Sequence, residues 1–232
     1  MVKYLLVGAG CLVVGFFVGL FVSNNINRTA SLQESEQLPP GHPDTPFLNQ
    51  QTQVASVKEP NGAMLPDVSE TLEKAKKEPE NFDAQIKAGN MYSQIQRADK
   101  ALEFFNTAAA LKPTEYEKIV QLGNAFFDIG EYERAETYYT QALEKKADDI
   151  SVRTDLGITF VERKNPDYDR AIKEFQTSLQ TNPKHEPTLY NLAFAFHKKG
   201  DEANAQKYLA QLEQANPNSQ LIGRLKQIFA QK

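Results

Sequence analysis

The pattern of apolar and polar positions changes twice along the chain, and each change marks a boundary. Residues 1–22 are almost entirely apolar, residues 23–66 are polar and rich in proline, and a helical period of apolar positions begins near Val68. The run from Tyr4 to Val22 holds 19 residues without a charge. As a helix it would span about 28 Å, close to the ~30 Å hydrocarbon core of a bilayer. The pattern predicts a transmembrane anchor at 1–22, a disordered linker at 23–66 and a helical domain from 67 onward.

Two processing signals are alternatives to an uncleaved anchor. Cleavage by signal peptidase after Ser23 would place Phe21 at the −3 position, where a small residue is needed. Cys11 follows a Gly-Ala-Gly run that resembles a lipobox, but the apolar stretch before it is too short for a signal-peptide core. We therefore interpret the segment as an anchor that stays in the protein.

The charges around the apolar run indicate its orientation. Lys3 precedes the run and Arg28 is the only basic residue soon after it, with two glutamates nearby. The positive-inside tendency then places the amino terminus in the cytoplasm. In a bacterium this predicts a single-pass inner-membrane protein whose soluble domain is periplasmic. Gly15 and Gly19 form a GxxxG motif that would allow association with other transmembrane helices, although glycine is also common in membrane helices without that role.

Residue types recur every 34 positions from Phe82 onward, in units that start at Phe82, Tyr116, Ile150 and Glu186. Small residues recur at the eighth position of the units, namely Gly89, Gly123, Gly157 and Ala193. Alanines recur at the twentieth position of the units, in their second half, namely Ala101, Ala135, Ala171 and Ala205. Large residues recur four positions after those alanines, namely Phe105, Tyr139, Phe175 and Leu209. Such spacing is expected where two helices of one unit cross closely and large side chains fill the remaining space.

These motifs resemble the tetratricopeptide repeat (TPR) family over residues 82–219. The resemblance implies an all-α fold, a right-handed TPR superhelix of four helix-turn-helix repeats at 82–115, 116–149, 150–185 and 186–218. Capping helices are predicted at 67–81 and 219–232, because the terminal repeats need a cover over their apolar sides. The units depart from the family pattern at Gln85 and Arg153, where a large apolar residue is usual, and at Ala147, which replaces proline. Two extra residues near Asn165 predict a longer turn inside the third repeat.

Charge and motifs argue against several functional classes. The net charge of −4 is mild and no basic stripe is present, so nucleic-acid binding is not expected. The only cysteine is Cys11, and the chain lacks hydrolase, zinc-protease and phosphate-loop motifs. His42, in the linker segment 41–44, has no second ligand at metal-binding spacing, and we interpret it as solvated. We expect no enzyme activity, no metal and no cofactor.

The resemblance implies that the first helix of each repeat lines a concave groove that binds a polypeptide. Counting along the units gives the candidate binding residues Asn90, Gln94, Val120, Asn124, Phe127, Ile158, Tyr190, Asn191, Phe194 and His197. In the family, an asparagine at the place of Asn90 and Asn124 commonly bonds the backbone of a bound peptide, because an amide both donates and accepts. Phe127 and Phe194 either anchor a ligand or pack between repeats. The same counting places Asp128 and Glu162 on this face.

The expected function is a membrane-tethered scaffold for another protein or peptide. Its layout looks like that of the TPR components of cytochrome c maturation, which hold apoprotein segments during assembly of a bacterial envelope complex. The alternative is a permanent structural accessory subunit of a membrane protein complex.

Overall fold

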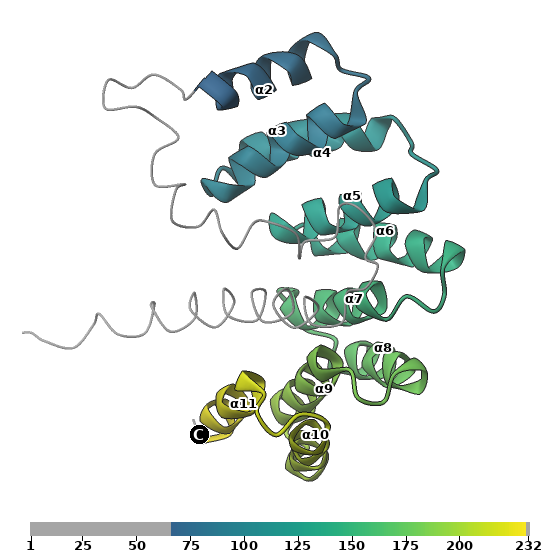
Figure 1. Ribbon diagram of the computed structural model, residues 1–232, viewed down its shortest axis with the longest axis vertical. Coiled ribbons are helices and arrows are strands. Elements are labelled where there is room, and N and C mark those ends of the chain that lie inside the picture. The colour runs from purple at the N-terminus through teal and green to yellow at the C-terminus, as the bar shows by residue number, and fades with distance from the viewer. Residues whose placement is uncertain (1–65, 231–232) are drawn as a thin grey trace, which may run out of the picture.

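The computed structural model describes residues 66–230, and within that range the secondary structure is entirely α-helical (Figure 1). The helices are α2 (Pro66–Lys77), α3 (Phe82–Gln94), α4 (Ala98–Ala110), α5 (Tyr116–Asp128), α6 (Tyr132–Lys145), α7 (Ile150–Glu162), α8 (Tyr168–Thr181), α9 (Glu186–Lys199), α10 (Glu202–Ala215) and α11 (Gln220–Ala230). The predicted anchor at 1–22 and linker at 23–66 lie outside the described residues, apart from Pro66 itself. Among residues 66–230, every helix is too short or too polar to cross a bilayer.

Four consecutive helix pairs build the array, which runs from α2 at one end to α11 at the other (Figure 1). The first helices of the pairs, α3, α5, α7 and α9, begin at Phe82, Tyr116, Ile150 and Glu186. These are the positions at which the sequence period places the start of each unit. We call these four the A helices, and their partners α4, α6, α8 and α10 the B helices. The predicted all-helical superhelix of TPR type is confirmed.

Short polar side chains fix where several helices begin. Asn81, Asp149, Asp167 and Asp201 each accept a hydrogen bond from the backbone N–H three residues on, at the starts of α3, α7, α8 and α10. Each bond satisfies a backbone donor that the first helical turn leaves without a partner. The sequence therefore specifies these boundaries locally, before any packing between repeats.

The turn between the A and B helices requires a left-handed residue in three of the four repeats. Gly130 and Gly200 have φ of 81° and 83°, a region that glycine enters without steric cost. Gln96 occupies the same place in the first repeat with φ of 59°, although it has a side chain. In the third repeat, α7 ends at Glu162 and α8 begins at Tyr168, so the two extra residues lengthen this turn as predicted.

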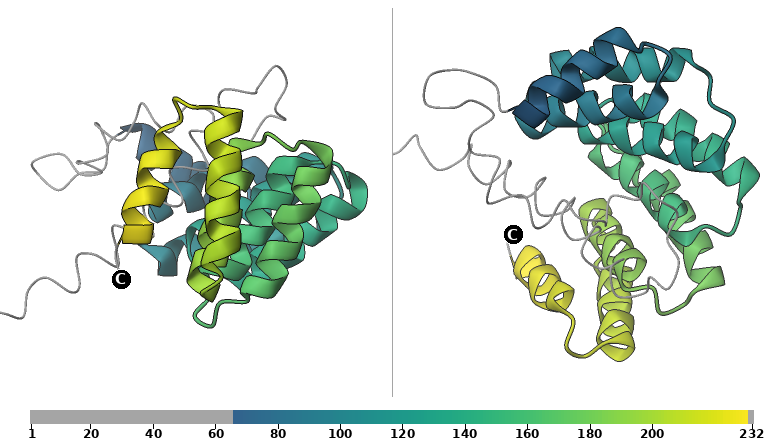
Figure 2. Two further views of the ribbon diagram at one scale, coloured as in Figure 1. Left: turned by 90° about the horizontal axis from the view of Figure 1, so that it is seen from below. Right: turned by 45° about the horizontal axis from the view of Figure 1, so that its top comes forward.

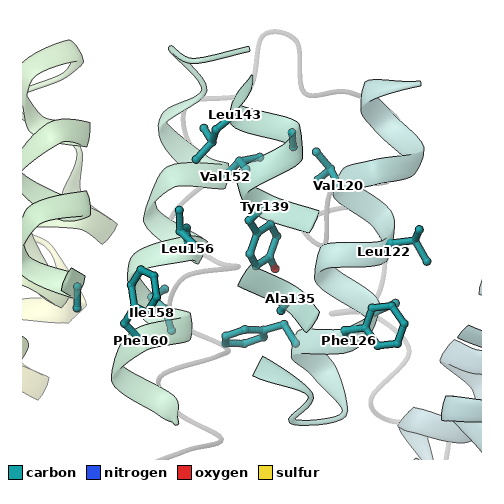
Figure 3. Close-up of a cluster of buried hydrophobic side chains, with 14 of the residues drawn as sticks. Val120, Leu122, Phe126, Ala135, Tyr139, Leu143, Val152, Leu156, Ile158 and Phe160 are labelled. Carbon is teal, nitrogen blue, oxygen red and sulfur yellow. The ribbon is translucent and has the colours of Figure 1, made fainter. Parts of the chain in front are cut away.

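The contact between the A and B helices of a repeat depends on glycine facing an aromatic ring. A Cβ added to Gly123 would lie 2.6 Å from Cε1 of Tyr139, and added to Gly89 or Gly157 it would overlap the ring of Phe105 or Phe175. All three rings are fully buried. Figure 3 shows Tyr139 lying between the helix that carries Phe126 and the helix that carries Phe160. The small residues predicted from the repeat thus make room for the rings of the B helices.

The fourth repeat solves the same packing problem with different side chains. Ala193 stands where the other repeats have glycine, and Leu209 stands where they have an aromatic ring. Both are buried in one cluster together with Leu212 and Leu225. The extra methyl group of Ala193 on the A helix is offset by the smaller side chain of Leu209 on the B helix. The total side-chain volume between the two helices therefore stays similar.

The two departures at the fourth position of a unit form polar links between helices. Gln85 is 2% exposed, and its Nε2 donates to the carbonyl oxygens of Ala75 at 2.6 Å and Glu78 at 3.3 Å. This ties the first repeat to the end of α2. Arg153 pairs with Glu174 of α8 at 2.8 Å and donates to the carbonyl oxygen of Ala147 at 2.9 Å. Both side chains thus form hydrogen bonds that an apolar residue at the same place could not make.

Helices α2 and α11 cover the two ends of the array (Figure 2). Leu72 and Ala75 of α2 are buried against Ala84 and Ala88 of α3. Leu221, Ile222 and Leu225 of α11 are buried in the cluster that includes the fourth repeat. Helix α2 begins one residue before the range 67–81 in which a cap was predicted, and α11 lies inside the range 219–232. Both bury apolar side chains that a terminal repeat would otherwise expose.

Candidate functional site

The candidate binding residues lie on the A helices, and we call the surface that they define the A-helix face. Their exposure differs widely. Gln94 is exposed, and three are half-buried, namely Asn90, Phe194 and His197. The others are buried with 3% to 9% of their surface exposed, namely Val120, Asn124, Phe127, Ile158, Tyr190 and Asn191. Helical counting gave the direction of these side chains but not how far neighbouring helices cover them.

Asn124, on α5, is the most informative of the buried candidates. It is 9% exposed, and its Oδ1 accepts a hydrogen bond of 2.8 Å from the hydroxyl of Tyr139 on α6. Its Nδ2 is buried and has no hydrogen-bond partner within the described residues. Because the hydroxyl fixes the oxygen end of the amide, the amino end is held in place as a donor. A buried donor without a partner costs about 1–3 kcal/mol, which a ligand carbonyl could recover.

Phe127 and Val120 belong to the main hydrophobic core. The ring of Phe127 is 8% exposed and packs edge-on against Tyr132, with the ring centroids 5.4 Å apart. Ile158 is 3% exposed in the same cluster. These side chains therefore pack between helices in this structure, and the aromatic contact of Phe127 is with the B helix of its own repeat. Phe194 remains half-buried, with the Lys198 ammonium 5.4 Å from its ring centroid.

Asn191 and His197 on α9 have partners inside the array. The Nδ2 of Asn191 donates to the carbonyl oxygen of Pro187, one turn earlier, at 2.8 Å. The ring of His197 stacks on Phe229 of α11 with centroids 4.6 Å apart, and its Nδ1 lies 2.8 Å from Oε1 of Glu202. Helical counting along the repeat places His197 on the binding face. The repeat period does not predict that α11 packs against α9 and covers this residue. In the structure this histidine contacts the capping helix.

Negative charge on the A-helix face is concentrated in the second and third repeats. Asp128 and Glu162 are the last residues of α5 and α7. Burial, followed by the negative charges of Glu162 and Asp128, raises the pKa of Tyr132 to about 12. Burial and then Glu162 also raise the pKa of Tyr168. The charge of Glu162 therefore acts on two phenols from neighbouring B helices, and the charge of Asp128 acts on one of them.

The end of the face formed by the fourth repeat has the opposite charge. The last turn of α9 carries His197, Lys198 and Lys199. Burial raises the pKa of Tyr190 to about 12, and the positive charge of Arg224 on α11 opposes that rise. Within residues 66–230, no group of three or more histidine and acidic side chains is placed to hold a metal ion.

Family models described as tetratricopeptide repeat match three stretches of the chain, residues 82–115, 120–184 and 162–228. Among curated proteins, the human protein O-mannosyl-transferase TMTC3 is 23% identical over 124 residues, which is 53% of this chain. The match covers 13% of the length of TMTC3.

Solved structures with the same architecture include YrrB, described as a TPR protein with an unusual peptide-binding site. It is 18% identical, with a TM-score of 0.57, over 86% of this chain and 97% of YrrB. A MamA crystal structure is 22% identical, with a TM-score of 0.54, over 68% of this chain and 82% of MamA. MamA from Desulfovibrio magneticus RS-1 is 15% identical, with a TM-score of 0.55, over 66% of this chain and 85% of the other. At these identities the likeness shows the fold alone.

Proposed function

Residues 82–228 belong to the tetratricopeptide repeat family, and we propose that the chain is a scaffold that binds a segment of another polypeptide on its A-helix face. The oriented amide of Asn124 is the observation that carries this proposal. Its oxygen is occupied by the Tyr139 hydroxyl, and its buried Nδ2 lacks a partner within the described residues. A polypeptide offers a carbonyl acceptor at every residue, so an extended segment supplies what this donor lacks. YrrB is a structural neighbour described as having a peptide-binding site, which agrees with such a role.

The test begins with a partner captured by the full-length chain from detergent-solubilised membranes and identified by mass spectrometry. Affinity of the purified pair is then measured for wild type and for Asn124→Ala. Loss of the donor should weaken binding by about 1–2 kcal/mol, or roughly 5- to 30-fold. Tyr139→Phe is the matched control, because it removes the bond to Oδ1 but leaves the amide and most of the ring volume. It should weaken binding less than Asn124→Ala does.

Helicity and thermal stability of both variants show whether the fold is intact. Normal affinity of a folded Asn124→Ala variant would mean that the partner binds elsewhere on the chain. This proposal assigns the chain a binding role on its A-helix face and no catalytic role.

We further propose that the apolar run from Tyr4 to Val22 tethers the repeats to a bacterial inner membrane, with the array in the periplasm. A tethered peptide-binding array suits the assembly of envelope complexes, and cytochrome c maturation is one such process. A reporter fused after Lys232 that is active only in the periplasm would support this topology, and one active only in the cytoplasm would refute it. Co-purification at fixed stoichiometry with a membrane complex would instead favour a permanent accessory subunit.

A further inference from the structure

The link between α4 and α5 differs from the other three links that follow a B helix. It consists of residues 111–115 and is one residue longer than the links 146–149, 182–185 and 216–219. In those three links, the residue after the B helix donates to the carbonyl oxygen four residues earlier and accepts from the N–H three residues later. In the first link, Leu111 and Lys112 donate to carbonyl oxygens three residues earlier, and the backbone bond that closes the other turns is absent from the described residues.

The backbone of this link is strained, and its first side chain is not packed. Lys112 has a φ of 48°, a left-handed conformation that is unfavourable for a residue with a side chain. Leu111 is 36% exposed and is the one large apolar side chain that residues 66–230 leave exposed. A strained conformation is unique only where its surroundings enforce it. With neither the closing bond nor packing around it, this link has other arrangements of similar free energy.

Hydrogen bonds between polar side chains join the A helices of the later repeats. The hydroxyl of Tyr116, at the start of α5, donates to Oδ2 of Asp149, at the start of α7, with 2.6 Å between the oxygens. The hydroxyls of Thr154 on α7 and Thr188 on α9 are fully buried and lie 2.7 Å apart. Such bonds are directional, so they hold neighbouring repeats in one orientation.

The junction between the first two repeats lacks an equivalent bond. Phe82 stands where the second repeat has Tyr116, and Glu115 stands where it has Asp149. Phenylalanine has no hydroxyl to donate, and the carboxylate of Glu115 pairs with Lys118 on α5 at 3.0 Å. The start of α3 is therefore not bonded to the start of α5.

The contacts that do cross this junction permit rotation. The ring of Phe105 on α4 meets the ring of Phe126 on α5 edge-on, with centroids 6.0 Å apart. Arg134 on α6 donates to Oδ1 of Asn106 on α4 at an exposed position. Apolar packing is not directional, and an exposed hydrogen bond exchanges with water at little cost. The first repeat can therefore turn against the second while their apolar contact persists.

We propose that residues 111–115 are a hinge, about which α2 and the first repeat rotate as one arm against a block formed by α5–α11. Helix α2 moves with the arm because the amide of Gln85 on α3 donates to the carbonyl oxygen of Ala75 at 2.6 Å. The rotation changes the spacing on the A-helix face between Asn90 in the arm and Asn124 in the block. The face thereby adjusts to segments of different shape. This inference goes beyond the proposed function, and its test needs no ligand.

The repeats supply matched positions at which this motion can be measured. Each B helix has an exposed residue two positions after its recurring alanine, namely Glu103, Thr137, Lys173 and Lys207. The full-length chain in detergent, with Cys11→Ser, receives nitroxide labels on cysteines introduced at 103 and 173, or at 137 and 207. Both pairs enclose the junction between the second and third repeats. The first pair also encloses the proposed hinge, and the second encloses the junction between the third and fourth repeats.

Double electron–electron resonance gives the distribution of distances for each pair. The first pair should have a distribution about twice as wide as the second, because a hinge populates several orientations. Phe82→Tyr combined with Glu115→Asp recreates the pair formed by Tyr116 and Asp149, and it should narrow the first distribution toward the width of the second. Tyr116→Phe is the matched control: it removes a bond at the junction that both pairs enclose, so it should widen both distributions.

Equal widths for the two pairs, whether both narrow or both wide, would refute the hinge. If the combined variant keeps wild-type helicity and melting temperature but does not narrow the first distribution, the absence of the bond is not what frees the junction. Circular dichroism of each labelled protein confirms that the fold is intact. None of these measurements depends on a bound polypeptide, so the hinge and the proposed function can fail independently.

Discussion

Replacing Gly123 with alanine tests whether the space between the A and B helices is as tight as the structure indicates. The new Cβ would lie 2.6 and 2.7 Å from Cε1 and Cδ1 of Tyr139 and 3.3 Å from its Cγ. The ring has little room to move away, because Tyr139 is 1% exposed and its hydroxyl is bonded to Asn124. Either the ring must leave its place or α5 and α6 must separate.

Two opposing contributions determine the expected change in the free energy of unfolding. Alanine is favoured over glycine inside a helix by about 1 kcal/mol. Overpacking a filled core costs about 1–3 kcal/mol, and contacts with two ring atoms place this site toward the upper end of that range. We expect Gly123→Ala to destabilise the protein by about 1–2 kcal/mol, which corresponds to a melting temperature lower by roughly 2–8 °C.

A double-mutant cycle shows whether Tyr139 is the cause. Tyr139→Leu alone should cost about 2–4 kcal/mol, because it leaves a cavity and removes the partner of the Asn124 oxygen. Combining it with Gly123→Ala recreates the pair that the fourth repeat already uses, Ala193 with Leu209. The double variant should therefore be more stable than the sum of the single effects by at least about 1 kcal/mol.

Urea unfolding followed by far-UV circular dichroism measures all three variants, and Gly223→Ala is the matched control. Gly223 lies within α11, and a Cβ added there would meet nothing within 4 Å. It should show only the gain in helix propensity, about 0.5–1 kcal/mol. If Gly123→Ala stabilised the protein as Gly223→Ala does, the interpretation of the glycine as a steric requirement would be wrong.

Three further predictions concern backbone conformation and pH. Gln96→Gly should stabilise the protein by up to about 1 kcal/mol in urea unfolding, because φ is 59° at this position, and Gly130→Gln should be destabilising by a similar amount. Ala147→Pro should stabilise by about 0.4–1 kcal/mol in the same assay, because the backbone of Lys146 (φ −139°, ψ 82°) is close to that of Asn182 (φ −133°, ψ 98°) and Asn216 (φ −149°, ψ 96°), which precede prolines in the third and fourth repeats. Unchanged or lower stability would contradict this. Burial lowers the pKa of His185 from 6.5 to about 4, so the unfolded chain binds the proton more readily. The contribution of His185 to the free energy of unfolding is therefore fully present above about pH 6.5, and it should fall by roughly 3 kcal/mol as the pH drops toward 4. Urea unfolding at a series of pH values should show this fall. The variant His185→Gln should lack it.

The sequence predicted the helix starts because each repeat places strict steric demands on a few positions. Gly89, Gly123 and Gly157 must be small because a ring from the B helix occupies the space beside them. Such demands recur with the period of the structure, and they are therefore visible in a single sequence. The first residues of α3, α5, α7 and α9 follow directly from that register.

The departures from the repeat could be seen in the sequence but not explained from it. Gln85 looked out of place at an apolar position, yet its amide donates to the carbonyl of Ala75 at 2.6 Å. Arg153 is matched by Glu174, which stands where the second and fourth repeats have Tyr138 and Tyr208. In both cases the partner lies on a different helix, and a partner on a different helix is not set by the repeat period.

The candidate site was predicted less completely, because helical counting gives the direction of a side chain and not what covers it. Phe127 points along the same face as Asn124 but is buried against Tyr132. His197 is covered by Phe229, whose helix lies beyond the last repeat. Coverage depends on how neighbouring repeats and the capping helix pack, which is decided by the whole array.

One detail of the sequence distinguishes Asn124 from the other asparagine at its place, Asn90. The B-helix residue that packs against the glycine preceding Asn124 is Tyr139, whereas the corresponding residue beside Asn90 is Phe105. A phenylalanine fills the same volume but has no hydroxyl to hold an amide oxygen. Only the second repeat therefore combines an asparagine with a hydroxyl that orients it, at 2.8 Å. Because an amide fixed before binding loses less entropy when a ligand arrives, Asn124 is better prepared than Asn90 to act as a donor. The polar recognition proposed for this face is therefore concentrated in the second repeat.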